Sequence, residues 1–197
     1  MPPLVVNGVL NIENLTEQEQ KKINIKQQLF FKKIQDDKRW YIENFLWIRD
    51  KNSKLVPLQL NPAQDIFDEE IKKCEEEGKL KRFIVLKARQ MGLSTYTEGR
   101  IFANTATNKF VNSLIIAHED RATQNLFNMS KLFYEELPDV IRPMKKYSNE
   151  KALVFENPTN DEIEKKKNPG LRSRITVATS GTTETGRIAT IHNLHIS

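Results

Sequence analysis

The stretch that decides the fold reads Phe83-Ile-Val-Leu-Lys-Ala-Arg-Gln-Met-Gly-Leu-Ser-Thr95. Its first four residues are all apolar, as in a strand that is buried on both faces of a sheet. Gly92 and Ser94 then mark a tight turn that opens a helix. A helix start offers free N–H groups and the positive end of the helix dipole, so it suits a phosphate. The stretch therefore predicts an interior strand over 83–86, a helix from near Ser94, and an anion over residues 88–95.

The turn departs from the common phosphate-binding pattern G-x-x-x-x-G-K-[ST] at two of its four fixed positions. Lys87 stands at the first glycine position and Leu93 at the lysine position, whereas Gly92 and Ser94 agree. Arg89 can supply the missing cation from within the loop, with Lys87 beside it. An arginine guanidinium is suited to this because it can donate two parallel hydrogen bonds to phosphate oxygens. Spacing alone leaves a basic turn with an incidental glycine as the alternative.

The rest of the chain alternates between the two kinds of element. Asn61 and Pro62 are typical of a helix start, and Gly78 is placed to end that helix. A further helix is expected from Ala122 to a stop at Pro138. The remaining strands are expected at 113–117, 152–155, 175–178 and within the apolar stretch 188–197. This alternation predicts an α/β fold with a parallel or mixed sheet.

Two segments stand apart from this alternation. Residues 1–60 predict a helical N-terminal arm, and residues 61–197 predict the α/β core. The basic run Lys165–Lys167, followed by Asn168-Pro-Gly170, predicts an exposed loop.

Composition narrows the function classes. The chain has 197 residues, of which 38% are hydrophobic, and a net charge of +5 that permits a polyanionic partner without demanding one. A single cysteine, Cys74, rules out an internal disulfide framework and a cysteine zinc site. No apolar run approaches the ~18 residues of a membrane span, and no signal peptide is expected at the N-terminus. His118, His192 and His195 fit no metal-ligand spacing and are expected to be structural.

Residues 88–95, Ala-Arg-Gln-Met-Gly-Leu-Ser-Thr, resemble the deviant Walker A loop of tailed-phage terminase large subunits. Three further blocks agree in order along most of the chain. Residues 45–64 are similar to the family's N-terminal region and its adenine-recognising glutamine motif, and residues 114–120 to its second conserved strand. Residues 172–197 are similar to the approach to its Walker B strand.

This resemblance implies a P-loop NTPase fold of the ASCE class, with a mixed or parallel sheet flanked by helices. It implies ATP and Mg²⁺ as cofactors, and an ATPase motor that drives double-stranded DNA into a procapsid. The implied partners are that DNA, the portal protein, the small terminase subunit and further copies of the chain in a ring. The implied location is the host bacterial cytoplasm, with no membrane partner.

The resemblance also assigns site residues. Phosphate binding falls to Ala88, Arg89, Gln90, Met91, Gly92, Leu93, Ser94 and Thr95. Arg89 takes the catalytic cation role with Lys87 as its helper, and the Ser94 hydroxyl ligates Mg²⁺. Asn61, Pro62 and Gln64 form the adenine site, and Arg187 is a candidate arginine finger. The alternatives are a plain helix cap at Asn61 and Gln64, a helix-start hydroxyl at Ser94, and an ordinary surface Arg187.

In the resembled family the Walker B strand ends in an acidic pair, and Ser197 stands at the first of these positions. We therefore expect an ATPase core that is incomplete at its C-terminal end and lacks the nuclease half. Such a chain would bind ATP but hydrolyse it slowly. Two alternatives remain open: another P-loop ATPase of the helicase superfamily, which normally keeps the lysine that Leu93 replaces, and a non-catalytic module that binds portal or DNA.

Overall fold

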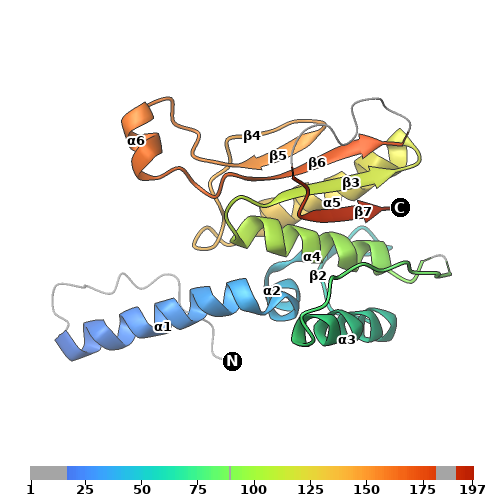
Figure 1. Ribbon diagram of the computed structural model, residues 1–197, viewed down its shortest axis with the longest axis horizontal. Coiled ribbons are helices and arrows are strands. Elements are labelled where there is room, and N and C mark those ends of the chain that lie inside the picture. The colour runs from blue at the N-terminus through green and yellow to red at the C-terminus, as the bar shows by residue number, and fades with distance from the viewer. Residues whose placement is uncertain (1–16, 89, 181–189) are drawn as a thin grey trace. The chain divides into compact units, whose positions relative to one another are not determined.

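The computed structural model describes residues 17–88, 90–180 and 190–197 (Figure 1). Helix α1, Glu17–Asp36, belongs to one compact unit, and residues Asp37–Ser197 form the other. Residues 37–60 therefore lie in the same unit as the sheet. The expected boundary between residues 60 and 61 does not coincide with the division between the two units.

The larger unit is built on a five-stranded mixed sheet in the order β4-β5-β6-β3-β7 (Figure 1). The strands β3 (Asn112–Ala117), β6 (Ser173–Thr179) and β7 (Asn193–Ile196) run parallel. On the other side of β6, β5 (Ala152–Phe155) and β4 (Tyr147–Ser148) continue the sheet antiparallel. The α/β fold with a mixed sheet is thus confirmed, as are the strands expected within these ranges.

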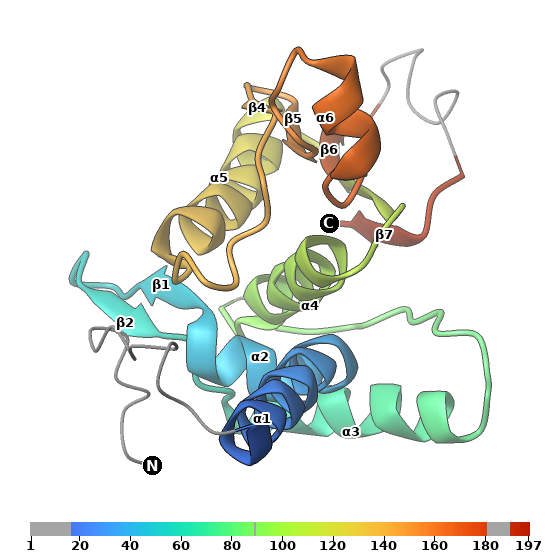
Figure 2. The same cartoon turned by 90° about the vertical axis from the view of Figure 1, so that its left-hand side faces the viewer.

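Two helices, α4 (Leu93–Thr107) and α5 (Asp120–Glu136), pack side by side on the same face of the sheet (Figure 2). Because these helices cover one face of the sheet, the side chains of β6 alternate between buried and half-exposed over most of the strand. Phe102 of α4 anchors the core between helices and sheet. Its ring centroid lies 5.5 Å from that of Phe133 and 6.2 Å from that of Phe155.

The remaining elements frame α4 and α5. Helix α2 (Lys38–Phe45) packs against α4, and the hairpin of β1 (Trp47–Arg49) and β2 (Leu55–Pro57) reaches α5 through β1. Helix α3 (Pro62–Glu76) begins after Asn61 and is followed by Gly78 in a left-handed conformation (φ 64°). The expected start and end of this helix are confirmed.

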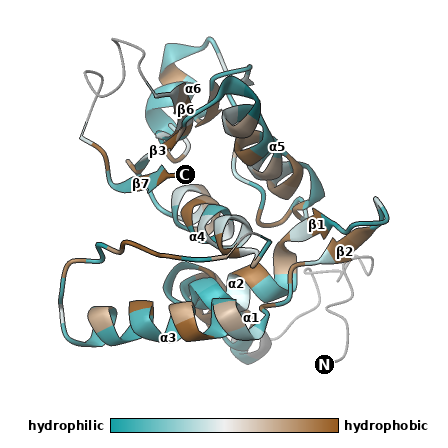
Figure 3. Cartoon of the chain, turned by 90° about the vertical axis from the view of Figure 1, so that its right-hand side faces the viewer, coloured by the Kyte–Doolittle hydropathy of each residue, from teal (hydrophilic) through white to brown (hydrophobic). Residues whose placement is uncertain are grey.

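The expected strand over 83–86 is wrong. Residues 79–88 carry no helix or strand, and Ile84 and Leu86 are fully exposed at 104% and 101%. The stretch appears as apolar chain between α3 and α4 (Figure 3). Apolar residues give strand propensity, but a strand also needs a neighbour for its backbone N–H and C=O groups. No described strand pairs with this stretch, and the sheet ends at β7.

The expected loop at Lys165–Lys167 is also wrong. These residues form the last turn of the short helix α6, Glu162–Lys167. The side chain of Asp161 caps this helix by accepting hydrogen bonds from the N–H groups of Ile163 and Glu164. Acidic residues in the first turn and lysines in the last turn both complement the helix dipole.

Candidate functional site: the loop before helix α4

The start of α4 lies at the carboxyl ends of the parallel strands β3 and β7. Glu98 contacts His195, and the side chain of Asn104 donates a hydrogen bond of 3.1 Å to Asn193. Residue numbers thus rise along α4 as they fall along β7, so the two elements run in opposite directions. In α/β sheets ligands bind at the carboxyl ends of the strands. The loop at residues 90–92 therefore occupies the usual ligand-binding edge.

This loop has an unusual backbone. Both Gln90 (φ 64°) and Gly92 (φ 70°) adopt the left-handed conformation. Glycine does so without steric cost, whereas a glutamine in this conformation is strained, and such strain concentrates at functional sites. The helix begins with a hydrogen bond from Tyr96 N to Gly92 O of 3.0 Å. The N–H groups of residues 93–95 consequently have no partner within the helix.

The loop is held in place by the cap of helix α3. The Gln64 side-chain N–H donates to Gly92 O at 2.7 Å, and the Asn61 side-chain N–H donates to Met91 O at 3.2 Å. Asn61 and Gln64 also form a reciprocal capping box at the start of α3. A Cβ on Gly92 would lie 2.8 Å from the Gln64 amide nitrogen. Gly92 is thus required both by its backbone conformation and by this close approach.

This arrangement gives the expected adenine residues a second role. Gln64 is only 3% exposed, and its carbonyl oxygen accepts from Asn61 N at 2.9 Å while its N–H donates to Gly92. Both polar ends of the side chain are therefore engaged with backbone. Pro62 occupies the first position of the helix. Adenine binding by these residues stays a prediction, and their positioning of the loop was not foreseen, although the Asn61-x-x-Gln64 spacing is a readable capping signal.

Several of the residues expected to bind phosphate lie together at the start of α4. Gln90, Met91 and Gly92 form the loop, and Leu93, Ser94 and Thr95 form the first turn of α4. Lys87 and Ala88 are exposed in the stretch before the loop. Arg89 and Arg187 lie outside the described residues, so their expected roles stay predictions.

A buried ion cluster fixes α4 against α3. The Tyr96 hydroxyl donates to Asp68 Oδ1 at 2.5 Å, and Arg100 contacts the same oxygen at 2.8 Å. Lys72 lies 2.9 Å from the other oxygen. Burial alone would raise the pKa of Asp68, but these hydrogen bonds and cations outweigh it and hold the pKa below its ordinary value. The cluster sets the position of α4 relative to the helix whose cap supports the loop.

A second buried pair lies deeper along α4. The carboxylate of Glu98 is fully buried, and one of its oxygens lies 2.5 Å from His195 Nδ1. Burial raises the pKa of Glu98, and His195 opposes that rise, with a smaller contribution from the Ser130 hydroxyl. Among the described residues, the other carboxylate oxygen has no hydrogen-bond partner. This pair joins α4 to β7.

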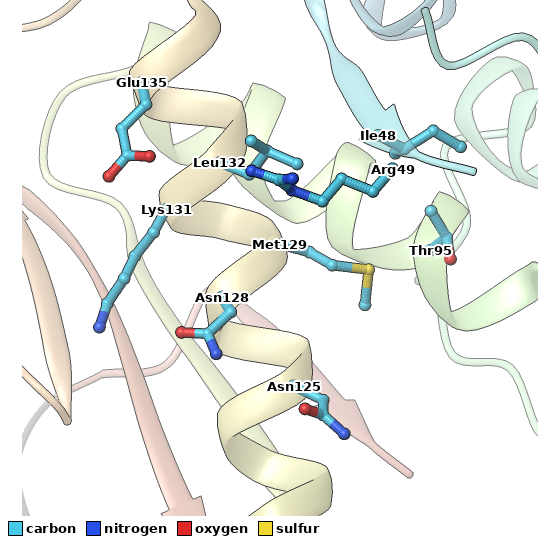
Figure 4. A pocket seen from close by; sticks show the side chains of 9 residues that line it. All are labelled: Ile48, Arg49, Thr95, Asn125, Asn128, Met129, Lys131, Leu132 and Glu135. Atoms are coloured by element: carbon cyan, nitrogen blue, oxygen red, sulfur yellow. The ribbon is translucent and has the colours of Figure 1, made fainter. Parts of the chain in front are cut away.

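A cavity of about 420 Å³ opens beside the first turn of α4 (Figure 4). Helix α5 supplies one wall with Met129 and Leu132, and β1 supplies the other with Ile48 and Arg49. Thr95, in the first turn of α4, also lines it. The cavity is therefore adjacent to the N–H groups that the start of α4 leaves free.

Two further observations concern ions and membranes. Within the described residues, no three His, Cys, Asp or Glu side chains come together as a metal site. The hydroxyl expected to ligate Mg²⁺ belongs to half-buried Ser94 at the helix start. None of the described helices combines the length and apolar character that crossing a bilayer requires.

Comparison of the chain with protein-family models gives no match, and neither does comparison with curated proteins.

Proposed function

We propose that the chain is the ATP-binding part of a DNA-packaging motor of the terminase type, with the nucleotide phosphates over residues 90–95. The observation that carries the proposal is the loop directly before α4. It holds two left-handed residues, Gln90 and Gly92, and the side chains of Asn61 and Gln64 fix it at the carboxyl edge of the sheet. A preorganised loop at a helix start is the arrangement that phosphate binding needs.

The chemistry follows from the residues at this edge. The free N–H groups of residues 93–95 would face the phosphate oxygens, and the Ser94 hydroxyl would ligate a Mg²⁺ ion bound with ATP. Arg89 and Lys87 would supply the positive charge that Leu93 does not. In phosphoryl transfer the protein contributes mainly positioning and charge stabilisation. Loop rigidity is therefore the property that the Gln64 and Asn61 contacts would supply.

The motor assignment rests on the sequence. The order of the four similar blocks, from residue 45 to residue 197, supports a terminase large subunit as the source of the pattern. The net charge of +5 is compatible with double-stranded DNA as the moved substrate. Portal protein, small terminase subunit and a ring of copies belong to the same proposal.

Equilibrium titration with ATP and Mg²⁺ tests the proposal, with phosphate release as a separate readout of turnover. We expect Arg89→Ala to weaken ATP binding more than Lys87→Ala does. Equal or reversed effects of the two substitutions would reassign the cation role. Absence of ATP binding by the unmodified chain would contradict the proposal and favour a module that contacts portal or DNA without nucleotide.

A further inference from the structure

A second cavity, of about 360 Å³, lies at the opposite edge of the sheet from the loop before α4. Asn112 and Arg174 line it, and they are the first residue of β3 and the second residue of β6. The cavity is therefore at the amino ends of the parallel strands, whereas the loop at residues 90–92 is at their carboxyl ends. A ligand in this cavity would be separate from one bound at the start of α4.

The cavity opens on the face of the sheet that points away from α4. The strand register aligns one lining residue from each of the neighbouring strands β4, β5, β6 and β3: Tyr147, Val154, Arg174 and Asn112. Residues that lie directly opposite one another share a face, and successive residues of a strand alternate between faces. Phe155, the residue after Val154, packs against Phe102 of α4. The aligned row with Val154 consequently faces the other way.

Positive side chains dominate the lining of this cavity. Lys146, Arg172 and Arg174 line it against a single carboxylate, that of Glu156. The Lys146 ammonium lies 3.1 Å from Glu156 Oε2, so this carboxylate compensates one of the cations. Three cations less one carboxylate leave an excess of two positive charges. A small anion such as phosphate would balance that excess.

The guanidinium of Arg174 is oriented by one of its nitrogens. Its Nε donates a hydrogen bond of 3.0 Å to Asn112 Oδ1, and the Asn112 amide nitrogen in turn donates to Thr190 O at 3.1 Å. The two terminal nitrogens of Arg174 have no hydrogen-bond partner among the described residues. A guanidinium fixed in this way is suited to donate two parallel hydrogen bonds to phosphate oxygens.

Arg172 brings a second guanidinium on a strained backbone. Its φ of 54° is left-handed, as is that of Phe110 (φ 61°), whose N–H donates to Leu171 O at 2.9 Å. The Arg172 side chain is exposed and has no ion pair within the part of the chain that the structure describes. Left-handed residues other than glycine cost energy and concentrate at functional sites. The strain here places an arginine at the cavity without a carboxylate partner.

We propose that this cavity binds a phosphate group, with Arg172 and Arg174 as its ligands and Lys146 as a further cation. The site is additional to the proposed phosphate loop before α4 and does not rest on it. Both a polynucleotide backbone and free phosphate offer the same charged oxygens, so the experiment uses a probe for each source.

The test follows the side-chain Nε–Hε signals of Arg172 and Arg174 in the ¹⁵N-labelled chain, each identified by its loss in the corresponding glutamine variant. Inorganic phosphate and a short DNA duplex are titrated separately. We expect saturable shifts of both signals. Arg172→Gln should weaken the affinity measured at Arg174 about tenfold, because a hydrogen bond to a charged group is lost. For the duplex, it should also lower the slope of log affinity against log salt by about 0.9.

Glu156→Gln should have the opposite effect. It removes the carboxylate that repels the anion and frees Lys146, so phosphate affinity should rise. Two substitutions control for overall charge, Arg121→Gln in the first turn of α5 and Glu150→Gln between β4 and β5. Both residues are exposed, and neither lines the cavity. Their affinities should match that of the unmodified chain.

The outcomes separate the two sources and the two proposals. Shifts with the duplex but not with inorganic phosphate would support the site and assign it to a polynucleotide backbone, and the reverse would support it as a site for free phosphate. Signals that do not move with either probe would overturn the inference, as would equal losses in Arg172→Gln and Arg121→Gln or weaker binding in Glu156→Gln. ATP binding should be unchanged in Arg172→Gln, so this inference and the proposed function can fail independently.

Discussion

The side-chain N–H of Gln64 donates a hydrogen bond of 2.7 Å to the backbone carbonyl of Gly92, across 28 positions of sequence. Through this hydrogen bond, the capping residues of α3 support the loop that precedes α4. Because the Gly92 carbonyl also accepts the first hydrogen bond of α4, from Tyr96, the contact fixes the direction in which the helix starts. The N–H groups of the first turn, which have no partner within the helix, are thereby oriented by Gln64.

Replacing Gln64 by alanine should loosen the loop. The Gly92 carbonyl would keep the N–H of Tyr96 but lose that of Gln64 at a half-buried position, which costs about 0.5–1.5 kcal/mol of unfolding free energy. Anion affinity should fall with it, because the first turn loses its support. Gln124→Ala is the matched control, since Gln124 also donates to a backbone carbonyl, that of Glu150, away from the loop. Denaturant unfolding and tripolyphosphate titration measure both effects, and equal behaviour of the two variants would remove the special role of Gln64.

Comparing Gly92→Ala with Gly78→Ala separates the backbone strain of a left-handed alanine from the close approach of the Gln64 side chain to residue 92. Both glycines are left-handed, with φ values of 70° and 64°, but a Cβ at Gly78 would meet nothing within 4 Å. Left-handed strain alone costs roughly 1–2 kcal/mol in each variant. The unfolding free energy of Gly92→Ala should fall by about 1 kcal/mol more, because the new Cβ pushes the Gln64 amide away from the backbone carbonyl of residue 92. The measurement is the difference in unfolding free energy between the two variants, and a difference of zero would contradict the close approach.

Asp68→Asn should destabilise the protein in a pH-dependent way. The folded-state pKa of Asp68 lies below its ordinary value, so the ionised cluster contributes stability above the unfolded pKa and loses it as pH falls through the folded pKa. Near pH 7 we expect a loss of about 3 kcal/mol, because a buried charge cluster loses its anion. The deficit should shrink below the ordinary carboxyl pKa of 3.8.

The control for that cluster is Asp139→Asn. Its partner is Arg142, and the Asp139 side chain is 90% exposed, so less than about 1 kcal/mol is expected at any pH. Urea unfolding of both variants between pH 3 and pH 8 gives the comparison. A deficit for Asp68→Asn that stays constant over this range would show that the charge of Asp68 does not act as described.

Glu98→Gln should have the opposite pH signature. The pKa of Glu98 is raised in the folded state, so the folded protein binds the proton of the Glu98 carboxyl group more tightly than the unfolded chain does. Stability therefore falls as pH rises from the ordinary value of 4.5 through the folded pKa. Glu98→Gln should remove this slope. His195→Asn should extend the slope to higher pH, because the opposing group is lost. An unchanged slope in both variants would mean that the pKa of Glu98 does not differ between the folded and unfolded states.

Local signals in the sequence were sufficient for several elements. The Asn61-Pro62 pair marks the start of α3 because the asparagine side chain satisfies the first N–H groups and proline fits the first turn. The strand expected at 113–117 is β3, where most residues are buried, three of them in succession. These features depend on neighbours in sequence or on a strongly apolar run with a partner strand.

Features that depend on distant residues were not predictable. The run 83–86 has the composition of an interior strand, but pairing is decided by whether a neighbouring strand is present, and β7 ends the sheet. The hydrogen bond from Gln64 to Gly92 joins two segments that no local pattern relates. The helix Glu162–Lys167 is indicated by acids that precede lysines, whereas the lysine run taken alone indicates a loop. The cavity beside Thr95 requires α5 and β1 to meet, which periodicity does not show.

We propose that the first turn of α4 and the loop before it bind phosphate. Amide chemical shifts of the ¹⁵N-labelled chain during titration with inorganic tripolyphosphate test it most directly, because the proposed ligands are backbone N–H groups. We expect saturable shifts that are largest at residues 90–95 and weaker in Gln64→Ala. Shifts that are absent there, or that are instead concentrated on the lysines of α6, would contradict it.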